Sequence, residues 1–261
     1  MSDVADYYQT SDHELARRYL GDRYPELNEE YFRAAIRHRY DLYPHIPEIA
    51  DFERFRDQDV LEIGVGQGSD HYMFASNGAI TTGIDITPKH CEITKLLFDT
   101  LGAKTRLFRA DARSLPFPNR SFDHVYSCGV LLLFPEMERA LAEIHRVLRT
   151  RGSATIMLYN KASIHYWLKT RLYYGWALNE NNLLGRDTVT DWYTDGIGYP
   201  KTYHYSPRSL RRLFRQFSKI EYRTACLTPE QIPEVGLPLD SDILRWLENH
   251  FGFFLWVRAW I

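Results

Sequence analysis

A glycine-rich loop and a carboxylate farther along the chain are the first residues suited to chemistry. Residues 62–68 have the pattern E-x-G-x-G-x-G, directly after an apolar run and before a helical pattern. Glycine permits a tight turn and lets the backbone approach a ligand closely. Asp85 follows the next apolar run, where a carboxylate can accept hydrogen bonds from both hydroxyl groups of a ribose. Enzymes that bind NAD share both features, so these residues predict a nucleoside cofactor without deciding which one.

Short apolar runs that alternate with helical patterns surround these residues. The alternation is typical of parallel strands joined by crossover helices. We expect strands at residues 60–63, 79–84, 105–109, 124–127 and 154–158. We expect helices at residues 12–20, 28–40, 69–76, 89–101 and 137–148, the last one followed by Arg151 and Gly152 as its stop. The glycine loop then lies between the first strand and the helix that follows it.

A third motif distinguishes between the possible cofactors. Asp111 follows the third expected strand, and residues 111–117 read D-A-R-S-L-P-F, followed by S-F-D-H-V at residues 121–125. Together with the glycine loop and Asp85, this order resembles the class I S-adenosylmethionine-dependent methyltransferases, a large group of which has D-A-x-x-L-P-F before S-F-D-x-V. The resemblance runs from about residue 39 to residue 152 and, more loosely, to the last strand. An NAD-dependent oxidoreductase gives no reason for Asp111 and is the weaker alternative.

The resemblance implies roles for individual residues in binding S-adenosylmethionine. The loop glycines Gly64, Gly66 and Gly68 would line the cofactor, and Glu62 would reach its methionine amino group, directly or through water. The positions that match the family's ribose, adenine and methionine contacts are Asp85, Ile86, Asp111, Ala112, Ser127 and Cys128. For Cys128, a small buried side chain is the simpler interpretation.

The resemblance also implies a doubly wound α/β fold with a seven-stranded, mostly parallel sheet in the order 3-2-1-4-5-7-6. Residues 1–50 are predicted as an N-terminal helical cap, 51–159 as the cofactor-binding core, 160–205 as an inserted lid, and 206–261 as the helix and strands that complete the core. From their position in the cap, Arg39, Tyr7, Tyr8 and Tyr40 are expected to close over the methionine carboxylate. The apolar run at 251–260 is interpreted as the last antiparallel strand, because it is too short to span a membrane.

One feature of many relatives is absent. Where they have G-V-L-H-H-x-P after the fourth strand, residues 129–135 read G-V-L-L-L-F-P. A sulfonium methyl group is already activated, so positioning of the acceptor can suffice. If the acceptor is a hydroxyl or an ammonium group, a base near it would help. The candidates for this base, or for contacts with the acceptor, are His71, His204, Asp195, Tyr203 and Tyr205.

Composition limits the partners. With Lys+Arg 32 and Asp+Glu 34, the formal charge of -2 lacks the basic excess expected for binding nucleic acid. The three cysteines are scattered, which predicts neither disulfides nor a metal site and favours a cytoplasmic setting. No apolar run approaches the length of a membrane span, so no membrane partner is expected, and the protein is expected to be a monomer or homodimer.

The expected function is methyl transfer from S-adenosylmethionine to a small molecule, with S-adenosylhomocysteine as the product. The aromatic content of 15%, with many rings between residues 159 and 205, favours an acceptor that stacks on aromatic side chains. We expect an oxygen or nitrogen acceptor on an aromatic or sugar-containing secondary metabolite. Transfer to carbon and a non-catalytic S-adenosylmethionine-binding protein are the alternatives.

Overall fold

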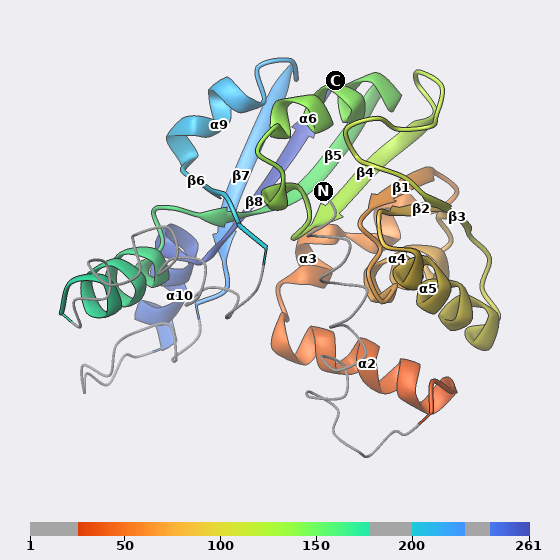
Figure 1. Cartoon of the computed structure of the whole chain (residues 1–261), viewed down its shortest axis with the longest axis horizontal. Coiled ribbons are helices and arrows are strands. Elements are labelled where there is room, and N and C mark those ends of the chain that lie inside the picture. The colour runs from red at the N-terminus through yellow and green to blue at the C-terminus, as the bar shows by residue number, and fades with distance from the viewer. Residues whose placement is uncertain (1–25, 178–199, 228–240) are drawn as a thin grey trace.

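An eight-stranded sheet forms the centre of the computed structural model, which describes residues 26–177, 200–227 and 241–261 (Figure 1). The sheet order is β3-β2-β1-β4-β5-β8-β7, and β6 pairs with β5 outside this path. Strands β1 to β5 are parallel, whereas β8 is antiparallel to both β5 and β7. The predicted fold class and strand order are therefore confirmed. The strands are β1 (Asp59–Ile63), β2 (Ile80–Asp85), β3 (Arg106–Arg109), β4 (Phe122–Cys128), β5 (Leu148–Asn160), β6 (His204–Tyr205), β7 (Lys219–Ala225) and β8 (Phe254–Trp260).

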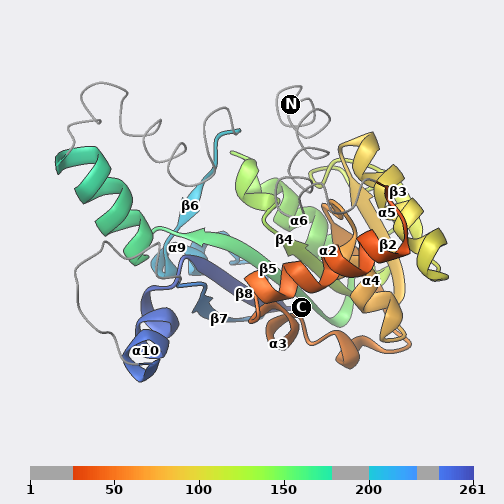
Figure 2. The same ribbon diagram turned by 90° about the horizontal axis from the view of Figure 1, so that it is seen from below.

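Helices lie on both faces of the sheet, with α2 to α5 on one side and α6 and α9 on the other (Figures 1 and 2). From β1 the chain builds β2 and β3 in one direction and then returns to place β4 on the other side of β1. Because crossovers are right-handed, this reversal puts the helices that precede it on one face of the sheet and the helices that follow it on the other. The helices are α2 (Glu29–Leu42), α3 (Ile46–Ala50), η2 (Phe52–Phe55), α4 (Ser69–Ser76), α5 (Pro88–Leu101), η3 (Leu131–Leu133), α6 (Met137–Val147), η4 (His165–Ala177), α9 (Pro207–Leu213) and α10 (Ser241–Phe251).

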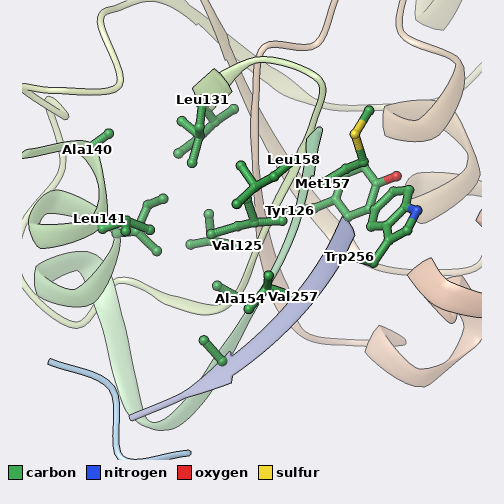
Figure 3. Close-up of a cluster of buried hydrophobic side chains, with 14 of the residues drawn as sticks. Val125, Tyr126, Leu131, Ala140, Leu141, Ala154, Met157, Leu158, Trp256 and Val257 are labelled. Carbon is green, nitrogen blue, oxygen red and sulfur yellow. The ribbon is translucent and has the colours of Figure 1, made fainter. Parts of the chain in front are cut away.

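The buried core lies around β4, β5 and β8, and alternate side chains of each strand face opposite sides (Figure 3). Val125, Leu158 and Val257 face the helix α6, where Leu141 meets them (Figure 3). Their strand neighbours Tyr126, Met157 and Trp256 face the other side, and Trp256 is 1% exposed. This period-two pattern explains why β8, the apolar C-terminal run, is a buried strand and not a membrane anchor.

The predicted stop of α6 at Arg151 and Gly152 is wrong. The helix ends at Val147, and its C-cap Leu148 already has an extended backbone with ψ 138. Arg151 has φ 72 and belongs to β5, where the pairing with β4 shifts register. A basic residue followed by glycine therefore marks an irregular strand start here, which the local pattern does not distinguish from a helix end.

The prediction of seven strands missed β6. This two-residue strand extends the sheet beside the carboxyl end of β5, where Tyr159 pairs with His204 and Asn160 with Tyr205. Two residues are too few to show any periodicity, so only the tertiary arrangement reveals the pairing.

The segments predicted as cap and lid are described in part. Helix α2 begins after its N-cap Asn28, whose side chain accepts a hydrogen bond from the Tyr31 amide at 3.0 Å. The described part of the predicted lid contains the π-helix η4. Residues 1–25 and 178–199, with the helix expected at 12–20, lie outside the described residues. No helix that the structure describes is long and apolar enough to cross a membrane.

Candidate active site

The glycine loop lies at the carboxyl end of β1, where the strand order reverses and open α/β sheets bind their ligands. Gly64, Gly66 and Gly68 all have positive φ, at 78, 52 and 84 degrees. A Cβ at Gly64 would lie 2.1 Å from Val130, and one at Gly68 would lie 2.9 Å from Thr94. A Cβ at Gly66 would meet nothing within 4 Å. The loop is thus tightly packed at both ends and open at its centre, which is the shape needed to approach a ligand with backbone.

Asp85, at the carboxyl end of β2, holds the loop in this shape. Its carboxylate accepts hydrogen bonds from the amides of Gly66 at 3.1 Å and Thr87 at 2.9 Å. His90 Nδ1 lies 3.0 Å from the same carboxylate. A carboxylate has about four acceptor sites, so three partners leave room for one more hydrogen bond. A ribose diol would therefore share this carboxylate with the loop or displace one of the three partners.

After β3, Asp111 forms an ion pair with Arg113 that the sequence did not predict. Asp111, the predicted adenine contact, forms a bidentate pair with Arg113, whose Nη2 lies 2.8 Å from Oδ2 and whose Nε lies 3.1 Å from Oδ1. Burial alone would raise the pKa of Asp111, but the hydrogen bonds from Arg113 lower it below its usual value. Arg113 also reaches Glu136 at 2.7 Å. Next to this pair, Ala112 is buried and Ile86 is half-buried.

An ion pair between half-buried Arg39 and buried Asp70 was not predicted. Arg39 of α2 donates to both oxygens of Asp70, at 2.7 and 2.5 Å, and Asp70 also accepts from Tyr40 at 3.0 Å and Tyr126 at 2.9 Å. Burial alone would raise the pKa of Asp70, but the Arg39 charge and these hydrogen bonds lower it. Arg39 Nη2 lies 3.5 Å from the Cys128 sulfur. Arg39 thus connects α2 to Asp70 of α4 and to Cys128 at the carboxyl end of β4.

Glu62 is part of a buried chain of hydrogen bonds that runs through His71 to Thr105. The Thr105 hydroxyl donates to the Thr81 carbonyl at 3.1 Å, so its oxygen accepts from His71 Nε2 at 2.7 Å. Burial lowers the pKa of His71 to about 3, which keeps the ring neutral. A neutral ring with its proton on Nε2 accepts at Nδ1, which lies 3.1 Å from Glu62 Oε2. With this tautomer Glu62 donates in its protonated form; with the proton on Nδ1 the Thr105 hydroxyl donates to Nε2 and the ring donates to the Glu62 carboxylate.

The electrostatic surroundings of Glu62 favour the protonated form of its carboxyl group. Burial raises the pKa of Glu62 well above its usual range, Asp70 and Asp85 raise it further, and Arg39 opposes them. His71 has no exposed surface, and both of its ring nitrogens have partners inside the chain. This placement argues against His71 as a base that touches an acceptor.

Two predicted residues, Ser127 and Cys128, are the last two residues of β4. The Ser127 hydroxyl is buried and donates to the Ile63 carbonyl at 3.1 Å, so it ties β4 to β1. Burial raises the pKa of Cys128 to about 12, so its thiol stays neutral at ordinary pH. Ser127 therefore has a structural role, whereas half-buried Cys128 lies at the loop surface.

His204 and Tyr205 lie in β6 at the carboxyl end of β5, the same edge of the sheet as the glycine loop. The His204 ring contacts Tyr159 at 5.4 Å and Tyr166 at 5.3 Å between ring centroids. Burial lowers the pKa of His204 to about 3, and burial raises that of Tyr205 to about 12. A ring with so low a pKa is a weak base near neutral pH, which argues against His204 as a general base.

The remaining candidates are placed as follows. The Tyr203 amide donates to the Leu132 carbonyl at 2.8 Å, which brings the start of β6 against η3. Asp195, Tyr7 and Tyr8 lie outside the described residues.

Comparisons with known proteins agree with this arrangement. Residues 61–156 match the family model described as a methyltransferase domain. The chain is 28% identical over 156 residues to a sterol 4-C-methyltransferase of Caenorhabditis elegans, covering 58% of this chain and 45% of that protein. It is 33% identical over 100 residues to a phosphatidylethanolamine N-methyltransferase of Cereibacter sphaeroides, covering 38% of this chain and 49% of that protein. Each match thus spans less than half of the relative.

Solved structures share the fold over nearly the whole chain. The magnesium protoporphyrin IX methyltransferase of Synechocystis, solved with bound S-adenosylhomocysteine, superposes with a TM-score of 0.59 at 18% identity. The likeness covers 98% of this chain and 97% of that one. The sheet order and the glycine loop therefore define a class I methyltransferase fold. Within it, residues 61–156 are similar to the methyltransferase-domain family.

Proposed function

We propose that this chain transfers the methyl group of S-adenosylmethionine to a lipid-class acceptor. The single observation that carries the cofactor assignment is the glycine loop, which is packed at Gly64 and Gly68 and open at Gly66, next to the Asp85 carboxylate. The open centre leaves space for a ligand at the point where the strand order reverses. When bound, the cofactor supplies a sulfonium-activated methyl group.

The residues of the loop edge fit this cofactor. Asp85 would accept the ribose hydroxyls, Ile86 and Ala112 would flank the adenine, and Asp111 would accept from its amino group. Because Arg113 already pairs with Asp111, adenine recognition would have to share that carboxylate with Arg113. Glu62 would hold the methionine ammonium group, directly or through water, and the open Gly66 backbone would lie along the ligand.

The methionine end would lie toward the loop after β4. Cys128 stands there beside Arg39, whose guanidinium lies between that loop and Asp70. The geometry supports a role for Arg39 in placing α2 against the cofactor loop. Arg39 would also bind the carboxylate of the methionine part.

A lipid-class acceptor is supported by two observations. The two relatives described above are named for a sterol and for phosphatidylethanolamine, both of which are lipids. The carboxyl end of β5 carries stacked aromatic rings, among them Tyr159 over Phe253 at 4.5 Å between centroids. An aromatic environment at this edge suits an apolar acceptor better than a charged one. The aromatic or sugar-containing metabolite expected from composition is the second possibility within the same reaction.

No protein base is required by this proposal. The low pKa of His204 and the burial of His71 leave the carboxyl edge without a strong base among the candidates that the structure describes. Catalysis would then depend on holding the acceptor in line with the sulfonium methyl group while water is excluded. His204 and Tyr205 would position the acceptor.

The test is titration calorimetry with S-adenosylmethionine and S-adenosylhomocysteine, followed by an acceptor screen that measures released S-adenosylhomocysteine. Binding with turnover of a lipid acceptor supports the proposal. Binding without turnover of any acceptor would favour the non-catalytic binding protein. Absence of binding to either ligand, with binding of NADH instead, would overturn the cofactor assignment.

A further inference from the structure

One chain of hydrogen bonds connects β1, α4 and the residue before β3. His71 Nδ1 lies 3.1 Å from Glu62 Oε2, and His71 Nε2 lies 2.7 Å from the Thr105 hydroxyl oxygen. Glu62 is 3% exposed, and His71 has no exposed surface. The His71 ring also packs on the Phe98 ring of α5, at 5.2 Å between ring centroids. Glu62, next to the glycine loop, is thus connected through a buried ring to half-buried Thr105.

The hydrogens of this chain can be arranged in two ways. In the first arrangement, the Glu62 carboxyl group donates to Nδ1 and the ring donates from Nε2 to Thr105, whose hydroxyl donates to the Thr81 carbonyl at 3.1 Å. In the second, the Thr105 hydroxyl donates to Nε2 and the ring donates from Nδ1 to the Glu62 carboxylate. The ring is neutral and both of its nitrogens are paired in each arrangement. The two arrangements therefore differ by one proton, which Glu62 carries in the first.

The charged groups around Glu62 favour the first arrangement in the free protein. Arg39 of α2 is bonded to Asp70 of α4, and Asp85 of β2 accepts from two backbone amides. Among the described residues, the one partner of Glu62 within ion-pair distance is His71, and burial lowers the pKa of that ring to about 3. A carboxylate at Glu62 would be buried beside a neutral ring, which is costly. Burial raises the pKa of Glu62, and Asp70 and Asp85 raise it further, while the charge of Arg39 opposes them.

We propose that His71 is a positioning residue that changes tautomer when the cofactor binds. Its Nδ1 accepts a hydrogen bond from Glu62 in the free protein and donates one to the Glu62 carboxylate in the complex. The inference rests on the proposed function, in which Glu62 holds the methionine ammonium group. That ammonium group supplies the cation that buried Glu62 lacks, so Glu62 gives up its proton.

The proton balance of this change is simple. The O–H bond of Glu62 breaks, Nδ1 of His71 gains a proton, Nε2 loses one, and one proton passes to water. The Thr105 hydroxyl then turns from the Thr81 carbonyl to Nε2, so neither ring nitrogen is left unpaired. A neutral imidazole can exchange its donor and its acceptor in this way. His71 thus allows a buried carboxyl group to change its charge while its hydrogen bond is kept.

Nitrogen-15 NMR of the histidine rings measures the tautomer, because protonated and unprotonated ring nitrogens have well-separated chemical shifts. The signals of His71 are those that disappear in His71→Gln. We expect the proton on Nε2 in the free protein at neutral pH and on Nδ1 in the complex with S-adenosylhomocysteine. The same tautomer in both states would overturn the inference, as would a doubly protonated ring. If His71→Gln does not fold, the wild type alone decides, since no ring that changes tautomer would overturn the inference equally.

Thr105 provides a second readout, the number of protons released on binding. Thr105→Val keeps the shape of the side chain but leaves a proton on Nε2 without an acceptor. Because a buried N–H without a partner is costly, the ring of this variant should carry its proton on Nδ1 before the cofactor binds. Calorimetry in two buffers should then show that proton release, about one in the wild type, falls by about half or more. Thr105→Ser keeps the hydroxyl group and should release as much as the wild type, and equal release by all three proteins would overturn the inference.

Glu62→Gln is the control for the tautomer itself. Its side chain has no proton to lose, so the tautomer of His71 should be the same with and without S-adenosylhomocysteine. A tautomer change in this variant would show that Glu62 does not cause it and would overturn the inference. Binding of S-adenosylhomocysteine to the wild type without a tautomer change would overturn the inference and leave the proposed function standing. No binding at all would overturn both, so the two failures are distinguishable.

Discussion

At the scale of single residues, Asp85 connects the glycine loop to the expected ribose. Asp85→Ala removes the acceptor of the Gly66 and Thr87 amides together with the proposed acceptor of the ribose hydroxyls. Hydrogen bonds to a charged group contribute about 1.5–3 kcal/mol each, so we expect S-adenosylmethionine affinity to fall about a hundredfold. Titration calorimetry measures this change, with Asp57→Ala, outside the site, as a control. Affinity equal to that of the wild type would contradict the assignment.

From the raised pKa of Glu62, we expect cofactor binding to release a proton. Its pKa is raised by burial and by Asp70 and Asp85, which favours the protonated carboxyl in the free protein. A bound ammonium group favours the carboxylate, which lowers the pKa of Glu62 in the complex. Affinity should therefore rise with pH until Glu62 ionises in the free protein as well. Calorimetry in two buffers of different ionisation enthalpy measures the proton released.

Glu62→Gln is the matched control for that proton. Its amide can still donate to His71 Nδ1, so the buried chain of hydrogen bonds is kept. The variant should bind more weakly and with an affinity that no longer rises with pH. Equal proton release by both proteins would show that another group titrates.

The ion pair of Asp70 with Arg39 is expected to stabilise the folded state. Asp70→Asn leaves Arg39 without its counter-charge, and removing one partner of a buried pair costs about 3 kcal/mol. Because the pKa of Asp70 is lowered in the folded state, its contribution is present above about pH 4 and is lost as the pH falls further. Urea unfolding at neutral and acidic pH measures both effects. Asp99→Asn, which breaks the exposed pair with Lys95, should cost less than about 0.5 kcal/mol.

Residue spacing predicted the glycines and Asp85 but not Asp70. The glycine loop is a local pattern, and a carboxylate after the next strand follows from the strand order. The partners of Asp70 are Arg39, 31 positions away, and Tyr126, 56 positions away. Only folding brings α2, α4 and β4 together, so no local signal marks this ion pair.

At the scale of elements, the strand–loop–helix unit predicts different results for two neighbouring glycines. Gly64→Ala puts a Cβ 2.1 Å from Val130 at φ 78, so it should destabilise the fold by about 2 kcal/mol. Gly66→Ala meets no neighbour and should cost only about 1 kcal/mol for its positive φ, yet it should weaken cofactor binding. Gly102→Ala is the control for the cost of a positive φ in alanine, because Gly102 also has a positive φ and open space around it. Thermal unfolding and calorimetry separate the two effects, and unchanged affinity in Gly66→Ala would contradict the open-loop interpretation.

The elements themselves were predicted unevenly. The helix α4 was predicted with its observed bounds, because it follows a glycine turn and fills a fixed place between two strands. The strand β5 is longer than predicted, and β6 was missed, because their limits depend on pairing with other strands. Periodicity identifies an element where one face is buried, whereas its ends are fixed by its neighbours.

At the scale of the whole molecule, one side chain of β8, Trp256, is expected to affect the stability of the entire fold. Trp256 is buried between strand neighbours and contacts Tyr126, so Trp256→Ala should destabilise the whole sheet by about 3–5 kcal/mol. Its indole N–H has no hydrogen-bond partner in the part of the chain that the structure describes. Trp256→Phe removes that unpaired donor and keeps most of the volume, so it should cost far less. Urea unfolding compares the two, and equal losses would contradict this account.

The sequence by itself determined the class of protein, because the glycine loop, Asp85 and the segment from Asp111 to Val125 are local patterns in a fixed order. The sequence also determined the parallel core, because each strand and each crossover helix has a recognisable pattern of apolar residues. The tertiary structure alone decided that Glu62 is buried beside His71, that Asp70 pairs with Arg39, and that η4 and α10 expose tryptophans. These features depend on burial and on contacts between distant segments, and the burial of a side chain is a property of the folded chain.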